Sequence, residues 1–411
     1  MPFRLPIKQN IQNLLNMVKF FKNIFYRMIF YAGPFFRSLT ENEFKQKDIR
    51  KILVVAIGEI GDVLRLFPLF KAIRTSFPGS KLSILTTLPG NHDVWTLLPQ
   101  SINIDEKIIL DIKRFHRGIL GKLSFIRDLR KKAFDLTIDP SRGDGMGPNS
   151  IMSFLIGSPH RVGFQKGGIG FLHTVKVNFS DDEYIGRQNL RLLEAIGISA
   201  SCFDIELHLP GPDHFTVNLL SNLKEPVVII HPGAKWNGWY RCWPPRKYAE
   251  LAKAIIRDYN ASLLLLGDDS EKKLTNWIAE EVGHPNVVDM AGQTSLSEVV
   301  VIIKNSHLFI GNDSSLLHLA VALTTPAVGI FGPTLPKQVL PSNPYFIPVC
   351  LGLPCRPCYT HQPLFNNQCT HRECLERLSV NKVMDAVRPM IDIRYKSSLK
   401  EKTPTGLPHH T

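Results

Sequence analysis

The sequence predicts an α/β protein of two doubly wound parallel-sheet domains that face a central cleft, preceded by an amphipathic helical arm. Continuous apolar runs typical of buried parallel strands alternate with segments of helical apolar spacing, and this alternation starts again after the Pro/Gly-containing segment 209–212. With 411 residues, 44% hydrophobic and 21% charged, the chain can form two ordinary domain cores. We predict an arm at 1–48, domains at 49–212 and 213–391, and a disordered tail at 392–411.

The arm is basic. Residues 1–51 contain ten Lys or Arg and three acidic residues, an excess of seven positive charges in a chain of net charge +13. Such an excess attracts nucleic acid, an anionic membrane surface or a phosphorylated substrate. Apolar residues of the arm recur near the helical period, and Lys19, Lys22 and Arg27 interrupt them too often for a membrane-spanning helix: Ile11, Leu14, Leu15, Val18, Phe21, Phe25, Met28 and Ile29.

This spacing predicts a helix that lies on an anionic membrane surface, with no nucleic-acid partner. A helix docked on the protein itself and an uncleaved signal-like segment are the alternatives. Because no small-residue cleavage site follows the apolar stretch, we expect a cytoplasmic protein held peripherally on the inner membrane.

The first domain begins with a buried strand, a Gly-x-x-Gly-Asp turn and a helix. Pro68 falls early in that helix, where a first turn or a kink accommodates it. The predicted elements are strands at 51–57, 81–86 and 136–139, a helix at 63–75, and a loop at 140–145.

The second domain repeats this order. Its predicted strands are 227–230, 263–266, 287–288, 308–310 and 327–331, and its predicted helices are 248–259, 274–282, 296–304 and one that begins after Asp313. Sheets of this kind bind ligands beyond the carboxyl ends of their strands, so two of them predict a site in the cleft between domains.

The most informative loop is Asp313-Ser314-Ser315-Leu316 with His318, which joins a buried strand to a helix start. The first N–H groups of a helix lack internal partners, and the helix dipole favours an anion there, so this loop predicts a phosphate site. The alternative is that Asp313 or Ser314 only caps its own helix.

Other strand-end loops also suit a sugar nucleotide. Arg241 offers a fixed donor fork for a pyrophosphate, with a solvated surface role as its alternative. The acidic run that ends at Glu271 suits ribose hydroxyls or a helix cap, and Thr294 lies in a structural turn that can reach the base. Asp62 offers a carboxylate inside the first helix, with a simple first-turn acid as its alternative. The turn before it lacks the glycine triplet of a dinucleotide site, which argues against an oxidoreductase.

An ordered set of motifs extends from about residue 51 to about residue 387: Ile57-Gly58-x-x-Gly61-Asp62-Val63 with Pro68, His231-Pro232-Gly233-Ala234, Trp243-Pro244, Ala291-Gly292-x-Thr294-Ser295-Leu296, Gly311-Asn312-Asp313-Ser314 with His318, and Phe331-Gly332-Pro333-Thr334. Together these motifs resemble glycosyltransferase family 9, the ADP-heptose:lipopolysaccharide heptosyltransferases.

The resemblance implies the GT-B architecture, two Rossmann-like domains with the donor held mainly by the second and the acceptor by the first. It makes Asp62 the general base and Arg241 the residue that neutralises the diphosphate. The other donor contacts that follow are Gly233, Ala234, Glu271, Thr294, Asp313, Ser314, Ser315 and His318. Gly61, Arg142 and Arg161 are the predicted acceptor contacts. The chain departs from the family at Ser315, where Gly is usual, and at the insertion-like segment 236–240.

These implications describe an inverting enzyme that transfers heptose from ADP-heptose, or a related nucleotide sugar, to a lipid-linked saccharide, the lipopolysaccharide inner core. No cofactor is expected for catalysis. The alternatives are a nucleotide-sugar epimerase and a catalytically silent lipid- or glycan-binding protein of the same fold.

Five of the seven cysteines lie near the C-terminus. Cys355, Cys358, Cys369 and Cys374 have spacing that suits a structural zinc cage, while Cys350 stands apart. Reduced packing cysteines and disulfides are the alternatives, and disulfides are less expected in a cytoplasmic enzyme.

Overall fold

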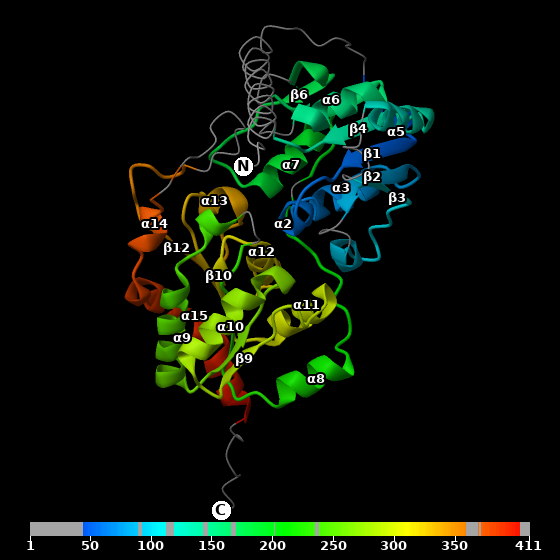
Figure 1. Ribbon diagram of the computed structural model, residues 1–411. Coiled ribbons are helices and arrows are strands. Elements are labelled where there is room, and N and C mark those ends of the chain that lie inside the picture. Colours follow the sequence, from blue (N-terminus) through cyan, green and yellow to red (C-terminus); the bar gives the residue numbers. More distant parts are fainter. Residues whose placement is uncertain are drawn as a thin grey trace, which may run out of the picture.

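Two parallel sheets of six strands, each wrapped by helices, form the two halves of the molecule (Figure 1). This computed structural model describes residues 44–88, 93–111, 119–142, 147–165, 170–200, 202–234, 238–358, 369 and 371–402. The predicted arm therefore lies almost entirely outside the described residues. Within these ranges, no helix combines the length and apolar character that crossing a membrane requires.

The first sheet has the strand order β3-β2-β1-β4-β5-β6, and every neighbouring pair is parallel. Its strands are β1 (Lys51–Val55), β2 (Lys81–Leu88), β3 (Glu106–Asp111), β4 (Leu136–Asp139), β5 (His160–Phe164) and β6 (Val175–Val177). Its helices are α2 (Ile60–Leu64), α3 (Phe67–Ser76), α5 (Ile119–Lys131), α6 (Gly147–Ile156) and α7 (Ile185–Glu194).

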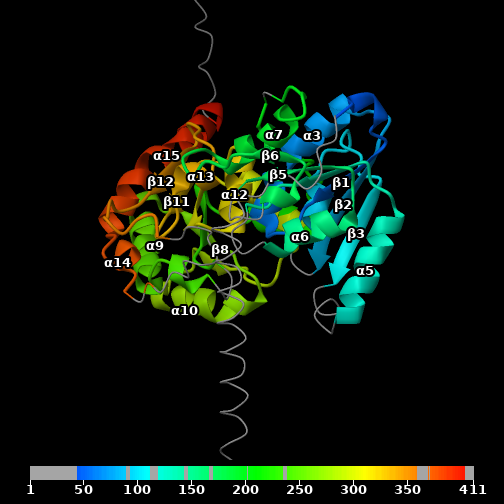
Figure 2. The same ribbon diagram turned by 90° about the horizontal axis from the view of Figure 1, so that it is seen from above.

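Both faces of this sheet are covered, which explains why β1 is apolar from Ile52 to Val55. Ile52 and Val54 pack in the core that includes α3 and α7, whereas Leu53 and Val55 pack against α5 and α6. Figure 2 shows these two helix pairs on opposite sides of the strands.

The second sheet has the order β12-β11-β10-β7-β8-β9, again all parallel. Its strands are β7 (Val227–His231), β8 (Ser262–Leu265), β9 (Val287–Asp289), β10 (Leu308–Asn312), β11 (Ala327–Ile330) and β12 (Phe346–Val349). Its helices are α8 (His214–Ser221), α9 (Pro245–Tyr259), α10 (Lys272–Val282), α11 (Leu296–Asn305), α12 (Ser315–Ala322), α13 (Pro336–Val339), α14 (Glu373–Glu376) and α15 (Val380–Lys402).

The two sheets share one topology. In each, the chain forms three strands in order from the centre of the sheet to one edge. It then returns to the centre and forms three more strands from there to the other edge. The loops after the two central strands therefore diverge, and ligands of doubly wound sheets bind at this switch point. In the first domain, these loops follow β1 and β4; in the second, they follow β7 and β10.

The structure refines the predicted helix at 63–75. The chain forms α2 and α3 instead, separated at Arg65 and Leu66, with Pro68 in the first turn of α3. Proline fits there because the first amides of a helix need no intrahelical acceptor. The break leaves Asp62 in a helix of only five residues.

The structure also corrects the predicted tail at 392–411, because α15 continues through Lys402. Ile391 is fully buried in the second core, and Arg394 donates hydrogen bonds to the carbonyl oxygens of Lys304 and Ser306 at 2.7 and 2.8 Å. These contacts hold the helix against the domain beyond residue 391. Residues 403–411 lie outside the described ranges.

Candidate active site

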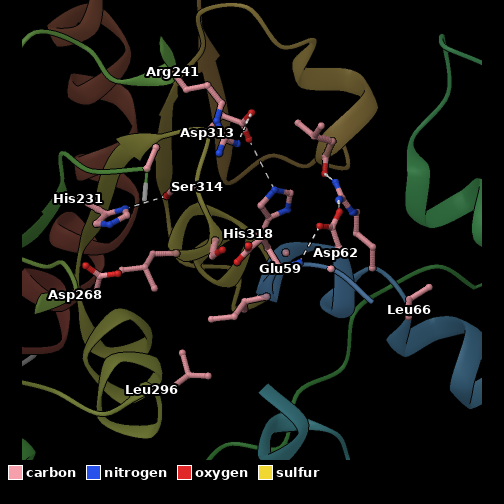
Figure 3. Close-up of a pocket in the computed structure, with 18 of the residues that line it drawn as sticks. Glu59, Asp62, Leu66, His231, Arg241, Asp268, Leu296, Asp313, Ser314 and His318 are labelled. Atoms are coloured by element: carbon pink, nitrogen blue, oxygen red, sulfur yellow. Dashed lines mark hydrogen bonds and ion pairs between the residues drawn. The ribbon is translucent and has the colours of Figure 1, made fainter. Parts of the chain in front are cut away.

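A cavity of about 840 Å³ lies between the two domains and is lined by residues from both. Residues at both switch points line it: Ile57 to Asp62 after β1, Pro140 to Arg142 after β4, His231 at the end of β7 with Ala234 after it, and Asp313 to Leu316 after β10. Figure 3 shows Glu59 and Asp62 on one wall, opposite Asp313, Ser314 and His318. The tertiary fold thus joins the predicted acceptor side and the predicted donor side in one opening.

Asp62 is held at the start of α2 with its carboxylate partly exposed. A capping box fixes it: the Glu59 side chain accepts from the Asp62 backbone, and Asp62 Oδ2 accepts from the Glu59 backbone N at 3.0 Å. Asp62 Oδ1 accepts a hydrogen bond from Arg65 Nη2 and lies 3.6 Å from Arg142 Nη2. Two guanidinium groups thus favour an ionised carboxylate, which is the form that can accept a proton.

The N-terminus of α12 is open to the cavity. Ser314 is the N-cap residue, but its hydroxyl makes no hydrogen bond to the helix amides; Ser314 Oγ lies 2.9 Å from His231 Nδ1 instead. This geometry contradicts the alternative that Ser314 only caps its helix. The first-turn amides, beginning at Ser315, have no acceptor within α12 and can bind an anion.

Glu271 joins this loop through His231. Its Oε2 lies 3.2 Å from His231 Nε2 and accepts from the Asp268 backbone N at 3.0 Å. Both side chains are more than nine-tenths buried. These hydrogen bonds therefore connect the ends of three different strands, β7, β8 and β10, through His231, Glu271 and Ser314.

Asn312, the last residue of β10, also holds these loops in place. It is fully buried, donates from Nδ2 to the Pro232 carbonyl oxygen at 2.7 Å, and accepts at Oδ1 from Trp243 N and Tyr248 Oη at 3.0 and 2.9 Å. Such a satisfied buried amide network rigidifies its surroundings. The network holds Trp243, and so it also positions Arg241, two residues earlier in the chain. Arg241 Nη1 lies 3.7 Å from Asp313 Oδ2.

Several other predicted donor contacts also border the cavity: Ala234, Arg241, Thr294, Ser315 and His318. Gly233 does not. A Cβ on Gly233 would lie 1.8 Å from Glu271 Oε1, so this glycine permits the close approach of Glu271 rather than facing a ligand itself.

His318 crosses the domain boundary. Its imidazole lies against Gly61 of α2, where an added Cβ would be 2.8 Å from His318 Cδ2. Burial, reinforced by the charge of Arg65, lowers the pKa of His318 to about 4. The side chain is therefore uncharged at neutral pH, and its contact with Gly61 is one of packing between the domains.

The structure places two of the three predicted acceptor contacts at the cavity. Gly61 and Arg142 line the cavity, but Arg161 does not. Arg161 is buried in the first domain, where it donates to the carbonyl oxygens of Leu172 and Ser158 at 3.0 and 2.6 Å. This placement corrects the expectation for Arg161, because its guanidinium satisfies main-chain carbonyls that would otherwise be buried without donors.

No disulfide joins any of the cysteines in this structure. All seven are described, and all are free thiols. Across the part of the chain that the structure describes, no three His, Cys, Asp or Glu side chains converge closely enough to bind a metal ion. Burial raises the pKa of the Cys374 thiol, and the nearby thiols of Cys358, Cys369 and Cys355 act in the same direction. The zinc site stays a prediction.

Comparison with known proteins identifies the family. The sequence profile described as glycosyltransferase family 9 (heptosyltransferase) matches residues 122–369, more than half of the chain. The protein belongs to glycosyltransferase family 9. Lipopolysaccharide heptosyltransferase 2 of Escherichia coli K12 is 27% identical over 313 residues, which cover 71% of this chain and 85% of that relative.

Solved structures of this family share the fold. Escherichia coli ADP-heptose lipopolysaccharide heptosyltransferase II aligns with a TM-score of 0.61 at 20% identity, covering 86% of this chain and all of that one. An Escherichia coli heptosyltransferase bound to ADP-2-deoxy-2-fluoro heptose aligns with a TM-score of 0.58 at 16% identity, covering 82% of this chain and 99% of that one. The resemblance to this glycosyltransferase family and the GT-B fold predicted from the sequence are thus confirmed.

Sequence reasoning missed three residues of this candidate site. Arg65 and Asp268 line the cavity but were not singled out, and His231 was quoted only as part of a turn motif. A histidine directly before Pro-Gly at a strand end was a usable signal for His231. Nothing in the local sequence shows that Arg65 is buried, because Asn189 and Val339, which contact it, lie far away in the chain.

Proposed function

We propose that this enzyme is an inverting transferase that moves heptose from ADP-heptose to the inner core of lipopolysaccharide. One observation carries the proposal: Asp62 from the first domain and the open N-terminus of α12 from the second border the same cavity. Family membership and the activities named for its relatives support transfer over epimerisation. The relative solved with an ADP-heptose analogue supports ADP-heptose as the donor class.

In the proposed reaction, the Asp62 carboxylate removes the proton of an acceptor hydroxyl as the hydroxyl oxygen forms a bond to the anomeric carbon of heptose. The bond from that carbon to the phosphate oxygen breaks, and ADP leaves with the bonding electrons. Inversion follows because the base and the leaving group act on opposite faces of the sugar. General-base catalysis of this kind contributes about 10²- to 10⁴-fold to a rate.

The second domain stabilises the leaving diphosphate. Arg241 supplies positive charge at the cavity wall, and the first-turn amides of α12 supply aligned donors. Asp313 contacts both Arg241 and His318, at 3.7 and 3.9 Å, and so orients them around the phosphates. In this arrangement the protein itself neutralises the diphosphate.

The remaining cavity residues divide between the two substrates. Glu271 and Thr294 lie where the loops after β8 and β9 reach the cavity, which suits the ribose and base of the nucleotide. Arg142 lies beside Asp62 on the opposite wall and suits a phosphate or carboxylate on the acceptor saccharide.

A lipid-linked acceptor requires the enzyme to reach a membrane. We propose that the basic arm at residues 1–48 attaches the enzyme peripherally to the cytoplasmic face of the inner membrane. The apolar spacing and the basic residues of that sequence support the proposal.

The decisive experiment incubates the purified enzyme with ADP-heptose, with and without a heptose-deficient lipopolysaccharide acceptor, and follows both products by mass spectrometry. Asp62→Asn should lower kcat about 10²- to 10⁴-fold while ADP affinity, measured by calorimetry, stays near that of the wild type. Arg241→Met should instead weaken ADP binding, because it removes charge from the diphosphate pocket.

The alternatives predict other outcomes. An epimerase would convert the sugar nucleotide without acceptor, and a silent binding protein would bind ADP-heptose with no turnover in any variant. Wild-type turnover that Asp62→Asn leaves unchanged would reject Asp62 as the base but not the transfer reaction.

A further inference from the structure

Arg65 connects the proposed base to the opposite domain. It lies three residues after Asp62, immediately beyond the end of α2, and only 5% of its surface is exposed. Its Nη2 donates to Asp62 Oδ1, while its Nη1 lies 3.4 Å from the carbonyl oxygen of Val339 at the end of α13. Its own carbonyl accepts from Asn189 Nδ2 at 3.2 Å, which fixes the end of α2 to α7.

This ion pair differs from an ordinary helix-surface pair. Exposed pairs three residues apart contribute little, because water screens them and the side chains stay mobile. Here the guanidinium is only 5% exposed and contacts the second domain at Val339, whereas the Asp62 side chain is 38% exposed. Burial of one partner makes the interaction stronger than that of a fully exposed pair. Separation of the domains would remove the Val339 carbonyl and admit water, so the strength of the pair depends on domain closure.

The pair also determines how the carboxylate is presented. The Glu59 backbone N binds Asp62 Oδ2, and Arg65 binds Oδ1, so together they fix the plane of the carboxylate. Near it also lie Arg142, 3.6 Å from Oδ1, and the uncharged imidazole of His318. Without Arg65, Arg142 would be the nearest cationic group left at Oδ1 among the described residues.

We propose that Arg65 is a positioning residue that couples closure of the two domains to the alignment of the Asp62 carboxylate. The inference rests on the proposed role of Asp62 as the base. Coupling is reciprocal: if closure strengthens the Arg65 to Asp62 pair, then Arg65 must favour the closed form. Replacement of Arg65 therefore has a kinetic consequence and a structural one.

The kinetic test compares Arg65→Met, which keeps the apolar length, with Arg65→Lys, which keeps the charge. Arg65→Met should lower kcat at least tenfold and change the KM for ADP-heptose less than threefold, because small misalignments at a reacting centre cost up to about 10²-fold. The acidic limb of its pH profile should move to higher pH, since a neighbouring cation has been removed. Arg65→Lys should recover part of kcat, because an ammonium can reach Asp62 but cannot also bind Val339.

The structural test does not need turnover. In small-angle scattering, Arg65→Met should have a larger radius of gyration than the wild type, both with ADP and without it. Lys337→Met is the matched control, because it removes an exposed interdomain pair with Asp182, 2.8 Å long, that lies outside the cavity lining. We expect its kcat and radius to stay near wild type.

The outcomes separate the two proposals. Absence of wild-type transfer would reject the proposed function, and scattering would still test the effect of Arg65 on closure. An active wild type with Arg65→Met unchanged in kcat, pH profile and radius would overturn the inference. Equal losses in Arg65→Met and Lys337→Met would also overturn it, because any weakened interface would then suffice.

Discussion

Gly61 offers the sharpest test of the contact between the domains. It is buried in α2 against the His318 imidazole of α12. In Gly61→Ala, the new Cβ would lie 2.8 Å from His318 Cδ2 and 3.1 Å from Cγ. Carbon atoms in good contact are about 3.5–4.0 Å apart, so the closed form is short of space by roughly 0.7 Å.

We expect the clash in Gly61→Ala to raise the free energy of the closed form without lowering the free energy of unfolding. Overpacking of this kind costs about 1–3 kcal/mol, which corresponds to a roughly five- to 150-fold loss in kcat/KM if the closed form is the reactive one. Within α2 alone, alanine is favoured over glycine by about 0.5–1 kcal/mol. Activity should therefore fall while resistance to unfolding stays the same or rises slightly, because opening the domains relieves the clash.

The assay pairs initial-rate kinetics with thermal unfolding. Gly79→Ala serves as the control, since no atom lies within 4 Å of a Cβ added there, in the same domain. Wild-type kcat/KM in Gly61→Ala would refute the claim that the domains meet at this contact during turnover. A large fall in Tm would show instead that the clash lies within a core that cannot open.

Two further predictions concern pH and the arm. Because the pKa of His318 is about 4 when folded and about 6.5 when unfolded, the unfolded chain binds the proton first; the free energy of unfolding should fall as pH drops from 6.5 towards 4, by at most about 3 kcal/mol. In urea denaturation, His318→Gln should lose less free energy of unfolding than the wild type as the pH falls. An equal dependence of this free energy on pH in the two proteins would contradict the burial argument. Deletion of residues 1–43, which keeps Phe44 against His160, should move the enzyme from anionic vesicles to the supernatant in a sedimentation assay; continued vesicle binding would reject the arm as the anchor.

Local patterns were sufficient for the repeating strands and helices of the central sheets. Residues 52–56 and 308–310 form continuous apolar runs because both faces of their strands are buried, and this requirement is visible in sequence. The sequence also indicated that Asp62 and Asp313 follow strands, since a turn or helix start must come next. The outer elements were harder: β3 is an edge strand with alternating exposure, and its mixed pattern gave no clear prediction.

Tertiary structure alone decided which of these loops meet and which side chains turn away. Arg65 and Val339 are 274 positions apart, and no periodicity near either residue encodes their contact. Arg161 carries the same charge as Arg142, yet the fold uses one for buried carbonyls and the other beside Asp62. The sequence by itself determined the two halves and the chemistry of their strand ends, because those follow from burial and turn geometry over a few residues. The packing of α2 against α12 decided the shared cavity, because contacts between distant segments depend on the complete fold.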